Sequence, residues 1–278
     1  MTYAASTHGV EVPVYDFGGN GPPLLLAHAT GFHGHVLEPL ARRLGEHFHG
    51  YAFDERGHGD ARTPVGIEFN WRGFADDALA AVDALGLTRP FGFGHSAGGA
   101  ALLMAQQLRP GTFRAIFCFE PIVIPVASPM GRGDNPLSEG ARRRREVFPS
   151  RDDAYENFAS KPPFSVLHPE VLHAYVDHGF ADQDDGSVRL KCHRDDEAEV
   201  YRGMGAHEAF ARLGEVHCPV TIACGEHTDA IGPAVVEAQA AALPDATTHV
   251  MPGLGHFGPL QDPDAVAALV VKAFAAVT

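Results

Sequence analysis

One serine stands out because of the residues that surround it. Ser96 lies in residues 94–98, Gly-His-Ser-Ala-Gly, which fit the pattern G-x-S-x-G, and a strand-like run at 90–94 leads into them. Glycines two residues before and after the serine permit a sharp strand-to-helix turn that exposes the hydroxyl. Because the pattern is short, it predicts a nucleophile only if a base and a carboxylate accompany it.

The base that would activate the serine is predicted from its position in the chain. A serine hydroxyl needs a neighbouring base, usually histidine, and the chain has 17 histidines. His256 lies in a glycine-rich loop at 253–259, directly after the last predicted strand, where it can reach the same sheet edge as Ser96. We therefore expect His256 to act as base and then acid. His95 points away from the serine's side of the strand, which favours a packing role.

A carboxylate must hold the histidine in the correct tautomer and stabilise its imidazolium form. Asp229, just past the strand predicted at 220–225, is the first choice, and Glu120 and Glu226 remain alternatives at neighbouring strand ends. With Asp229, the chain order is serine, aspartate, histidine, one of the few orders known for this geometry and the one that accompanies a strand-turn-helix elbow.

The oxyanion that forms during acyl transfer needs two backbone N–H donors. Ala97, at the start of the helix after Ser96, supplies one. The second is expected in the loop after the apolar strand at 24–27, with Thr30 as the candidate and Gly31 or Phe32 as alternatives. His28 in the same loop is expected to support the backbone.

The elements that must position these residues alternate between strand and helix. This order predicts an α/β fold with a mostly parallel twisted β-sheet flanked by helices. Pro13 favours an edge position for the first strand. The predicted strands lie at 10–17, 24–27, 51–53, 90–94, 115–119, 220–225 and 247–251, and the predicted helices at 36–48, 71–85, 97–109, 233–243 and 266–277.

The alternation lapses between residues 121 and 212, where charges, prolines and histidines increase. We interpret this stretch as a mainly helical cap inserted into a core formed by residues 1–120 and 213–278, placed to cover a ligand. The run Arg142–Arg145 could hold an anionic substrate. With Glu139 and Glu146 beside it, a solvated helix face is the favoured interpretation.

Composition limits the classes of function. The formal charge of −14 opposes nucleic-acid binding. The first ten residues lack a signal-peptide pattern, and no apolar run is long enough for a membrane span, so we expect a cytoplasmic protein that does not bind a membrane. We further expect it to act on a small molecule without a metal or cofactor, as a monomer or homodimer. The four cysteines lack CxxC spacing, which predicts reduced and mostly buried thiols: Cys118, Cys192, Cys218 and Cys224.

Four motifs in order resemble those of the α/β-hydrolase family, over nearly the whole chain. Residues 28–31 resemble its HG-x-x oxyanion loop, residues 54–59 resemble D-x-R-G-x-G, and the elbow and the segment 253–257 match as they stand. Ala29 departs from the usual glycine, and Asp229 lies one residue further from its strand glycine than is commonest. The resemblance implies a serine hydrolase whose helical cap shapes the substrate pocket.

This constellation predicts hydrolysis of a carboxylic ester, thioester or lactone through an acyl-enzyme on Ser96. A carbon–carbon bond hydrolase on the same residues is the alternative, and a non-catalytic small-ligand receptor is the alternative of another class. The expected substrate is small and largely apolar, since several aromatic residues could line a pocket, although such residues more often belong to the core: Phe32, Trp71, Phe164, Phe180 and Phe257.

Overall fold

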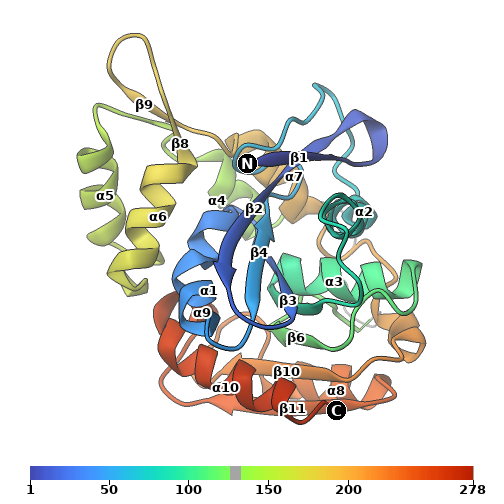
Figure 1. Ribbon diagram of the computed structural model, residues 1–278. Helices are drawn as coiled ribbons and strands as arrows, with labels where there is room; N and C mark the ends of the chain where they lie inside the picture. Colours follow the sequence, from blue (N-terminus) through green and yellow to red (C-terminus); the bar gives the residue numbers. More distant parts are fainter. Residues whose placement is uncertain (126–132, 278) are drawn as a thin grey trace.

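The computed structural model describes residues 1–125 and 133–277 and contains one large β-sheet of eight strands (Figure 1). The strand order is β1-β2-β4-β3-β5-β6-β10-β11, with antiparallel pairing of β1 with β2 and β2 with β4 and parallel pairing elsewhere. The strands are β1 (Thr2–Ala5), β2 (Glu11–Gly19), β3 (Pro23–Ala27), β4 (His49–Phe53), β5 (Phe91–His95), β6 (Ile116–Phe119), β10 (Val220–Gly225) and β11 (Ala246–Met251). The predicted fold class is confirmed.

The expectation that Pro13 marks an edge strand is wrong. β1 pairs with β2 on its outer side and places Tyr3 opposite Pro13. Proline lacks an N–H but keeps its carbonyl, which accepts the N–H of Asp54 at 3.3 Å, so β2 still bonds to the inner side of the sheet. β1 has only four residues and one buried side chain, too short a pattern to be recognised in the sequence.

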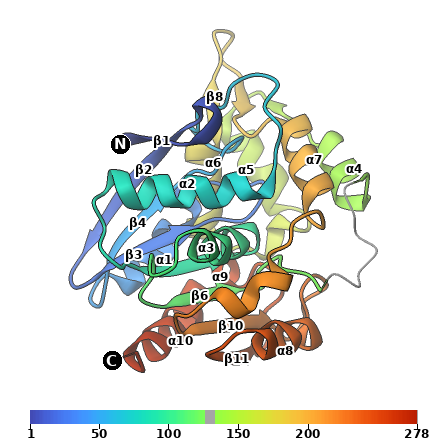
Figure 2. The same ribbon diagram turned by 90° about the vertical axis from the view of Figure 1, so that its right-hand side faces the viewer.

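Helices cover both faces of the sheet (Figure 2), and each face has its own apolar core of buried side chains. Successive side chains of β3 point to opposite faces, so Leu25 packs into one core while Leu24 and Leu26 pack into the other. One face carries α2 (Trp71–Ala84), α3 (Ala97–Leu108) and α8 (Pro233–Ala242), and the other carries α1 (Glu38–Leu44), α9 (Gly258–Gln261) and α10 (Pro263–Ala275).

Between β6 and β10 lies a second set of elements, which we call the cap segment (residues 133–219). Its helices are α4 (Pro136–Arg142), α5 (Arg151–Ala159), α6 (Pro169–Gly179) and α7 (Arg194–Gly203), followed by a 3-10 helix at Phe210–Glu215. The predicted cap range 121–212 includes residues 126–132, which lie outside the described residues.

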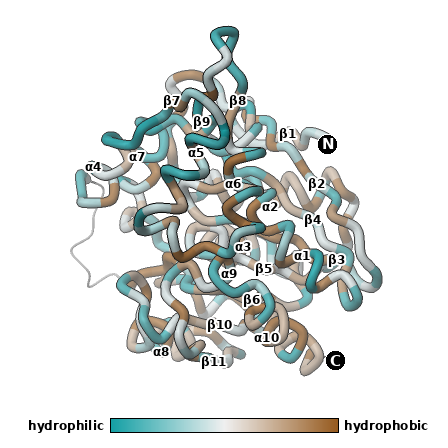
Figure 3. Tube along the Cα trace, turned by 90° about the vertical axis from the view of Figure 1, so that its left-hand side faces the viewer, coloured by the Kyte–Doolittle hydropathy of each residue, from teal (hydrophilic) through white to brown (hydrophobic). Residues whose placement is uncertain are grey.

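The cap segment also contains a small antiparallel sheet, β7-β9-β8, which the sequence did not predict because its strands have only two or three residues: β7 (Val147–Phe148), β8 (Phe180–Asp182) and β9 (Val188–Leu190). The turn between β8 and β9 is hydrophilic and projects from the molecule (Figure 3). In contrast, α6 buries one apolar side, which includes Val171, Leu172 and Val176.

The four cysteines are all free and buried, as the sequence predicted. Across residues 1–125 and 133–277, every helix is too short or too polar to cross a membrane.

Candidate active site

Ser96 lies on a tight turn between β5 and α3. Its backbone has φ 55° and ψ −111°, a conformation that non-glycine residues rarely adopt and that costs on the order of 1–3 kcal/mol. The flanking glycines are required by space: a Cβ on Gly94 would lie 2.6 Å from the Cα of Gly99, and one on Gly98 would lie 2.3 Å from the carbonyl oxygen of Ala27. This is the geometry expected of a nucleophile elbow.

His256 lies in the loop between β11 and α9, and its Nδ1 is 2.7 Å from Oε2 of Glu120. Glu120 directly follows β6, the strand beside β5, and the N–H of Ser96 bonds to the carbonyl of Phe119 at 2.9 Å. Ser96 and Glu120 therefore lie at the ends of adjacent strands, and His256 contacts Glu120 from a third loop.

The surroundings of Glu120 favour its ionised form. Its Oε1 accepts the Gly225 N–H at 2.9 Å, and its Oε2 accepts the Thr228 hydroxyl at 2.7 Å and the Ile231 N–H at 3.3 Å. Burial opposes ionisation, but the hydrogen bond and charge of His256, with these donors, hold the pKa of Glu120 below its usual value. An ionised carboxylate only accepts, so Nδ1 of His256 carries the proton and Nε2 is left as a base.

The expectation that Asp229 pairs with His256 is corrected by this geometry. Asp229 is exposed, and among the described residues it has no hydrogen bond to His256. The other alternative, Glu226, is also exposed and accepts the N–H of Gly253 at 2.9 Å. The physical reason is that the loop after β10 directs its donors at Thr228 and Ile231 onto Glu120, which leaves Asp229, between them, outside that network.

Two further histidines support the backbone of the site. His95 is fully buried, and its Nε2 is 2.9 Å from the carbonyl oxygen of His256. Burial and the nearby His256 lower the pKa of His95 to about 3, so it stays neutral and donates this bond. His28 receives the N–H of Glu55 on Nε2 at 3.0 Å and donates from Nδ1 to the carbonyl of Ala29 at 2.8 Å, which fixes the start of the loop that carries Thr30.

The N–H groups of Ala97 and Thr30 remain available as oxyanion donors. Neither has a hydrogen-bond acceptor within the described part of the chain. The N–H of Phe32, an alternative in the sequence analysis, bonds to the carbonyl of Ala29 at 3.1 Å and is thus occupied, while that of Gly31 has no described acceptor.

Ser96, His256 and Thr30 line one cavity of about 570 Å³, the Ser96 cavity. Asp229 also lines it. Most of the remaining lining is apolar and comes from both the core and the cap segment: Trp71, Ile122, Leu137, Met204, Ile231 and Phe257. Such a mixture of apolar walls and a few polar groups is typical of a small-molecule site.

One group of side chains in the described residues combines metal-ligand types, namely His35, Glu38 and His178. None of the three lines the Ser96 cavity. The rings of His35 and His178 are stacked, with centroids 3.8 Å apart and planes 10° apart. Because a ring nitrogen binds a metal in the plane of its ring, two parallel stacked rings do not converge on one ion.

An elbow serine, a loop histidine and a buried carboxylate at the carboxyl edge of a mostly parallel sheet are the parts of a serine-hydrolase-type site. The model of the alpha/beta hydrolase family matches residues 24–269, and the chain belongs to this family.

Relatives of this chain include several hydrolases. A 2-(acetamidomethylene)succinate hydrolase from Mesorhizobium japonicum is 25% identical over 242 residues, which cover 86% of this chain and 83% of that protein. Among solved structures, E-2-(acetamidomethylene)succinate hydrolase superposes with a TM-score of 0.83 at 20% identity, over 99% of this chain and 98% of that one. The enol-lactonase from Burkholderia xenovorans LB400 has a TM-score of 0.75 at 19% identity, over 99% and 100%. At these identities the two structures show a shared fold.

Proposed function

We propose that this protein is a serine hydrolase that cleaves an ester, thioester or lactone, with Ser96 as nucleophile, His256 as base and acid, and Glu120 as the triad carboxylate. The observation that carries the proposal is the 2.7 Å contact between His256 Nδ1 and Glu120 Oε2, because Glu120 is held ionised and so fixes the histidine tautomer that can accept a proton from Ser96.

The reaction proceeds by two acyl transfers. Nε2 of His256 takes the proton of Ser96 as Oγ attacks the acyl carbon, and the carbonyl oxygen becomes an oxyanion bound by the N–H groups of Ala97 and Thr30. The tetrahedral intermediate collapses, the leaving group departs with the proton from His256, and an acyl-enzyme remains. Water then attacks the acyl carbon, giving its proton to His256, and collapse of the second intermediate returns a proton to Ser96 and releases the acid.

The Ser96 cavity supports a small acyl substrate. Its volume of about 570 Å³ and its apolar walls suit a short acyl or alcohol group. The relatives' names support hydrolytic chemistry on this scaffold: one is a hydrolase of an acetamidomethylene succinate and another is an enol-lactonase.

Covalent labelling tests the proposal. A fluorophosphonate should label the wild-type protein on Ser96, as read by peptide mass spectrometry, and should not label Ser96→Ala. Wild-type protein should hydrolyse p-nitrophenyl butyrate, and S96A should reduce the rate to background. A folded protein that neither takes the label nor turns over the ester would contradict the proposal and favour the receptor. Cleavage of a vinylogous 1,5-diketone without ester turnover would favour the carbon–carbon hydrolase.

A further inference from the structure

A second cavity of about 520 Å³ adjoins the Ser96 cavity, and we call it the arginine cavity. The two cavities share five lining residues, which include Thr30 of the oxyanion loop and Phe257, the neighbour of the proposed base. Its other lining residues come from the oxyanion loop, from α4, α5 and the stretch between them, from the stretch after α5 that includes Lys161, and from Glu197 of α7. A substrate bound at Ser96 can therefore extend into this space.

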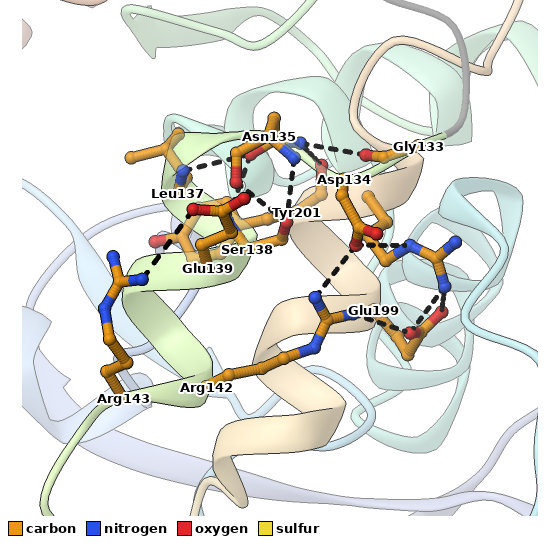
Figure 4. Close-up of polar contacts among 11 residues, drawn as sticks. Gly133, Asp134, Asn135, Leu137, Ser138, Glu139, Arg142, Arg143, Glu199 and Tyr201 are labelled. Atoms are coloured by element: carbon orange, nitrogen blue, oxygen red, sulfur yellow. Dashed lines mark hydrogen bonds and ion pairs between the residues drawn. The ribbon is translucent and has the colours of Figure 1, made fainter.

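The arginine run 142–145 is divided between two tasks. Arg142 is not among the residues that line the arginine cavity; it pairs with Asp134, just before α4, at 2.8 Å and with Glu199 of α7 at 3.6 Å (Figure 4). Arg143, Arg144 and Arg145 all line the cavity. The prediction of a solvated helix face is wrong for Arg144, whose side chain is largely buried, because the run continues past the end of α4 at Arg142; Arg143 and Arg145 are exposed as predicted.

Arg144 is the inner cation of this cavity, with a side chain only 16% exposed. It pairs with Glu197 of α7 and donates to the Tyr175 hydroxyl of α6. The pair lies directly over the oxyanion loop: a Cβ on Gly31 would be 2.6 Å from Oε1 of Glu197 and 3.3 Å from Nη1 of Arg144. A guanidinium has five N–H donors, and the described bonds use two of those of Arg144.

The outer cations are not fully neutralised. Among the residues that the structure describes, Glu197 is the one carboxylate that lines the cavity, beside four cationic side chains. Arg143 has an exposed partner, Glu139, at 3.7 Å (Figure 4). Among the described residues, Arg145 and Lys161 have only neutral partners: the carbonyl of Val147 at 2.8 Å and Oδ1 of Asn157 at 2.7 Å. The arginine cavity therefore carries more positive than negative charge, although the whole chain has a formal charge of −14. Such a local positive field attracts anions to the space beside the oxyanion loop.

We propose that the arginine cavity is an anion subsite, and that the substrate of Ser96 carries a carboxylate that Arg145 and Lys161 bind. This inference rests on the proposed function and narrows its substrate class from apolar esters to acidic ones. The apolar Ser96 cavity holds the reacting acyl group, while the charged end lies in the arginine cavity. Charge-assisted hydrogen bonds there make the difference between an acidic substrate and its neutral analogue about tenfold to a hundredfold in kcat/KM.

A matched pair of esters tests the subsite. The mono-p-nitrophenyl ester of glutaric acid carries a free carboxylate, and p-nitrophenyl methyl glutarate has the same acyl chain without the charge. Wild-type protein should prefer the acidic ester at least tenfold. R145Q and K161Q should each reduce this preference, mainly by raising KM for the acidic ester. R189Q is the control, because Arg189 is an exposed cap cation outside both cavities and should leave the preference unchanged.

The outcomes separate the subsite from the hydrolase. Equal kcat/KM values for the two esters, or an equal loss of preference in R189Q, would overturn the subsite while the hydrolase stands.

If neither ester is hydrolysed, calorimetry on S96A with the same two esters tests the subsite by binding alone. Tighter binding of the acidic ester, reduced in R145Q/S96A and K161Q/S96A, would support the subsite without the hydrolase, and equal binding would overturn it. Competition against the acidic ester in wild-type protein distinguishes phosphate from carboxylate recognition: stronger inhibition by sodium phosphate than by sodium glutarate would overturn the carboxylate assignment.

Discussion

The loops that follow β6 and β10 each present a carboxylate near His256, yet they use it differently. Glu120, after β6, is fully buried with φ 47° and has four hydrogen-bond partners. Asp229, after β10, is exposed and lines the Ser96 cavity. The end of β10 and the loop after it contribute three donors to Glu120 instead: the N–H of Gly225, the hydroxyl of Thr228 and the N–H of Ile231.

A carboxylate's position at the sheet edge is therefore not enough to predict which acid pairs with the histidine of a triad. Both strand ends are close enough for a loop histidine to reach. The carboxylate that becomes useful is the one whose charge is stabilised by converging donors, because only an ionised group fixes the imidazole tautomer and offsets the charge formed on it.

The largest expected effect is that of Glu120→Gln, which should lower kcat for p-nitrophenyl butyrate on the order of 10³- to 10⁴-fold. The amide nitrogen must replace one carboxylate oxygen. At the Oε2 position it would force His256 into the wrong tautomer, and at the Oε1 position it would oppose the Gly225 N–H while the negative charge is still lost. Circular dichroism checks that the variant folds, and a kcat within tenfold of wild type would remove Glu120 from the triad.

A smaller effect is expected from Thr228→Val, which keeps the shape of the side chain and removes one donor to Glu120. We expect kcat/KM to fall about threefold to tenfold, since a hydrogen bond to a charged group contributes about 1.5–3 kcal/mol, only part of which acts on the transition state. Losing a donor to the charged form raises the pKa of Glu120, so the part of the acid limb of the pH profile that comes from protonation of Glu120 should move to higher pH.

Thr247→Val is the control for Thr228→Val. Thr247 is an exposed strand residue whose hydroxyl contacts that of Thr221 at 3.2 Å, away from the Ser96 cavity. Its loss should leave both the rate and the pH profile unchanged. An unshifted acid limb in T228V would mean that the hydroxyl does not contribute to the ionisation of Glu120.

The sequence predicted the main strands and helices because buried parallel strands are short apolar runs and amphipathic helices repeat every three to four residues. It also led to Ser96 and His256, whose glycine-rich flanks are local signals. The choice between Glu120 and Asp229 could not be made in the same way. It depends on where the donors at Gly225, Thr228 and Ile231, which lie 105 to 111 residues beyond Glu120, point in the folded chain, and the local sequence of Glu120 does not carry that information.

The interpretation of residues 142–145 as a solvated helix face was incomplete for a related reason. Charge runs usually face solvent, and the side chain of Arg142 is partly exposed, as that rule predicts. Arg144 is largely shielded from solvent because the cap segment brings Glu197 and Tyr175, residues from α7 and α6, around its guanidinium. Long-range pairing of this kind is set by tertiary packing.

The pH dependence of the free energy of unfolding should show whether Glu120 is stabilised in its charged form. Glu120 has a folded-state pKa below its unfolded value near 4.5, so its contribution to the free energy of unfolding is complete above that pH and is lost as the pH falls toward the folded pKa. The stability difference between wild type and E120Q should therefore be smaller at pH 3.5 than at pH 7 in urea denaturation. The buried histidines affect both proteins equally, and a constant difference would indicate that Glu120 is not stabilised as a charge.

The smallest effect is expected from Asp229→Asn, the counterpart of E120Q on the other loop. Asp229 is exposed and has no described hydrogen bond to His256, so kcat for the neutral butyrate ester should stay within about twofold of wild type. Because Asp229 lines the Ser96 cavity, removal of its charge should lower KM for an acidic ester. The decrease should be small, because it corresponds to a free energy below the Coulomb repulsion of about 1 kcal/mol between two like charges 4 Å apart in water. A loss of 10³-fold in D229N together with a mild E120Q would reverse the two assignments, since it would mean that the loop after β10 rearranges to bring Asp229 onto His256 when substrate binds.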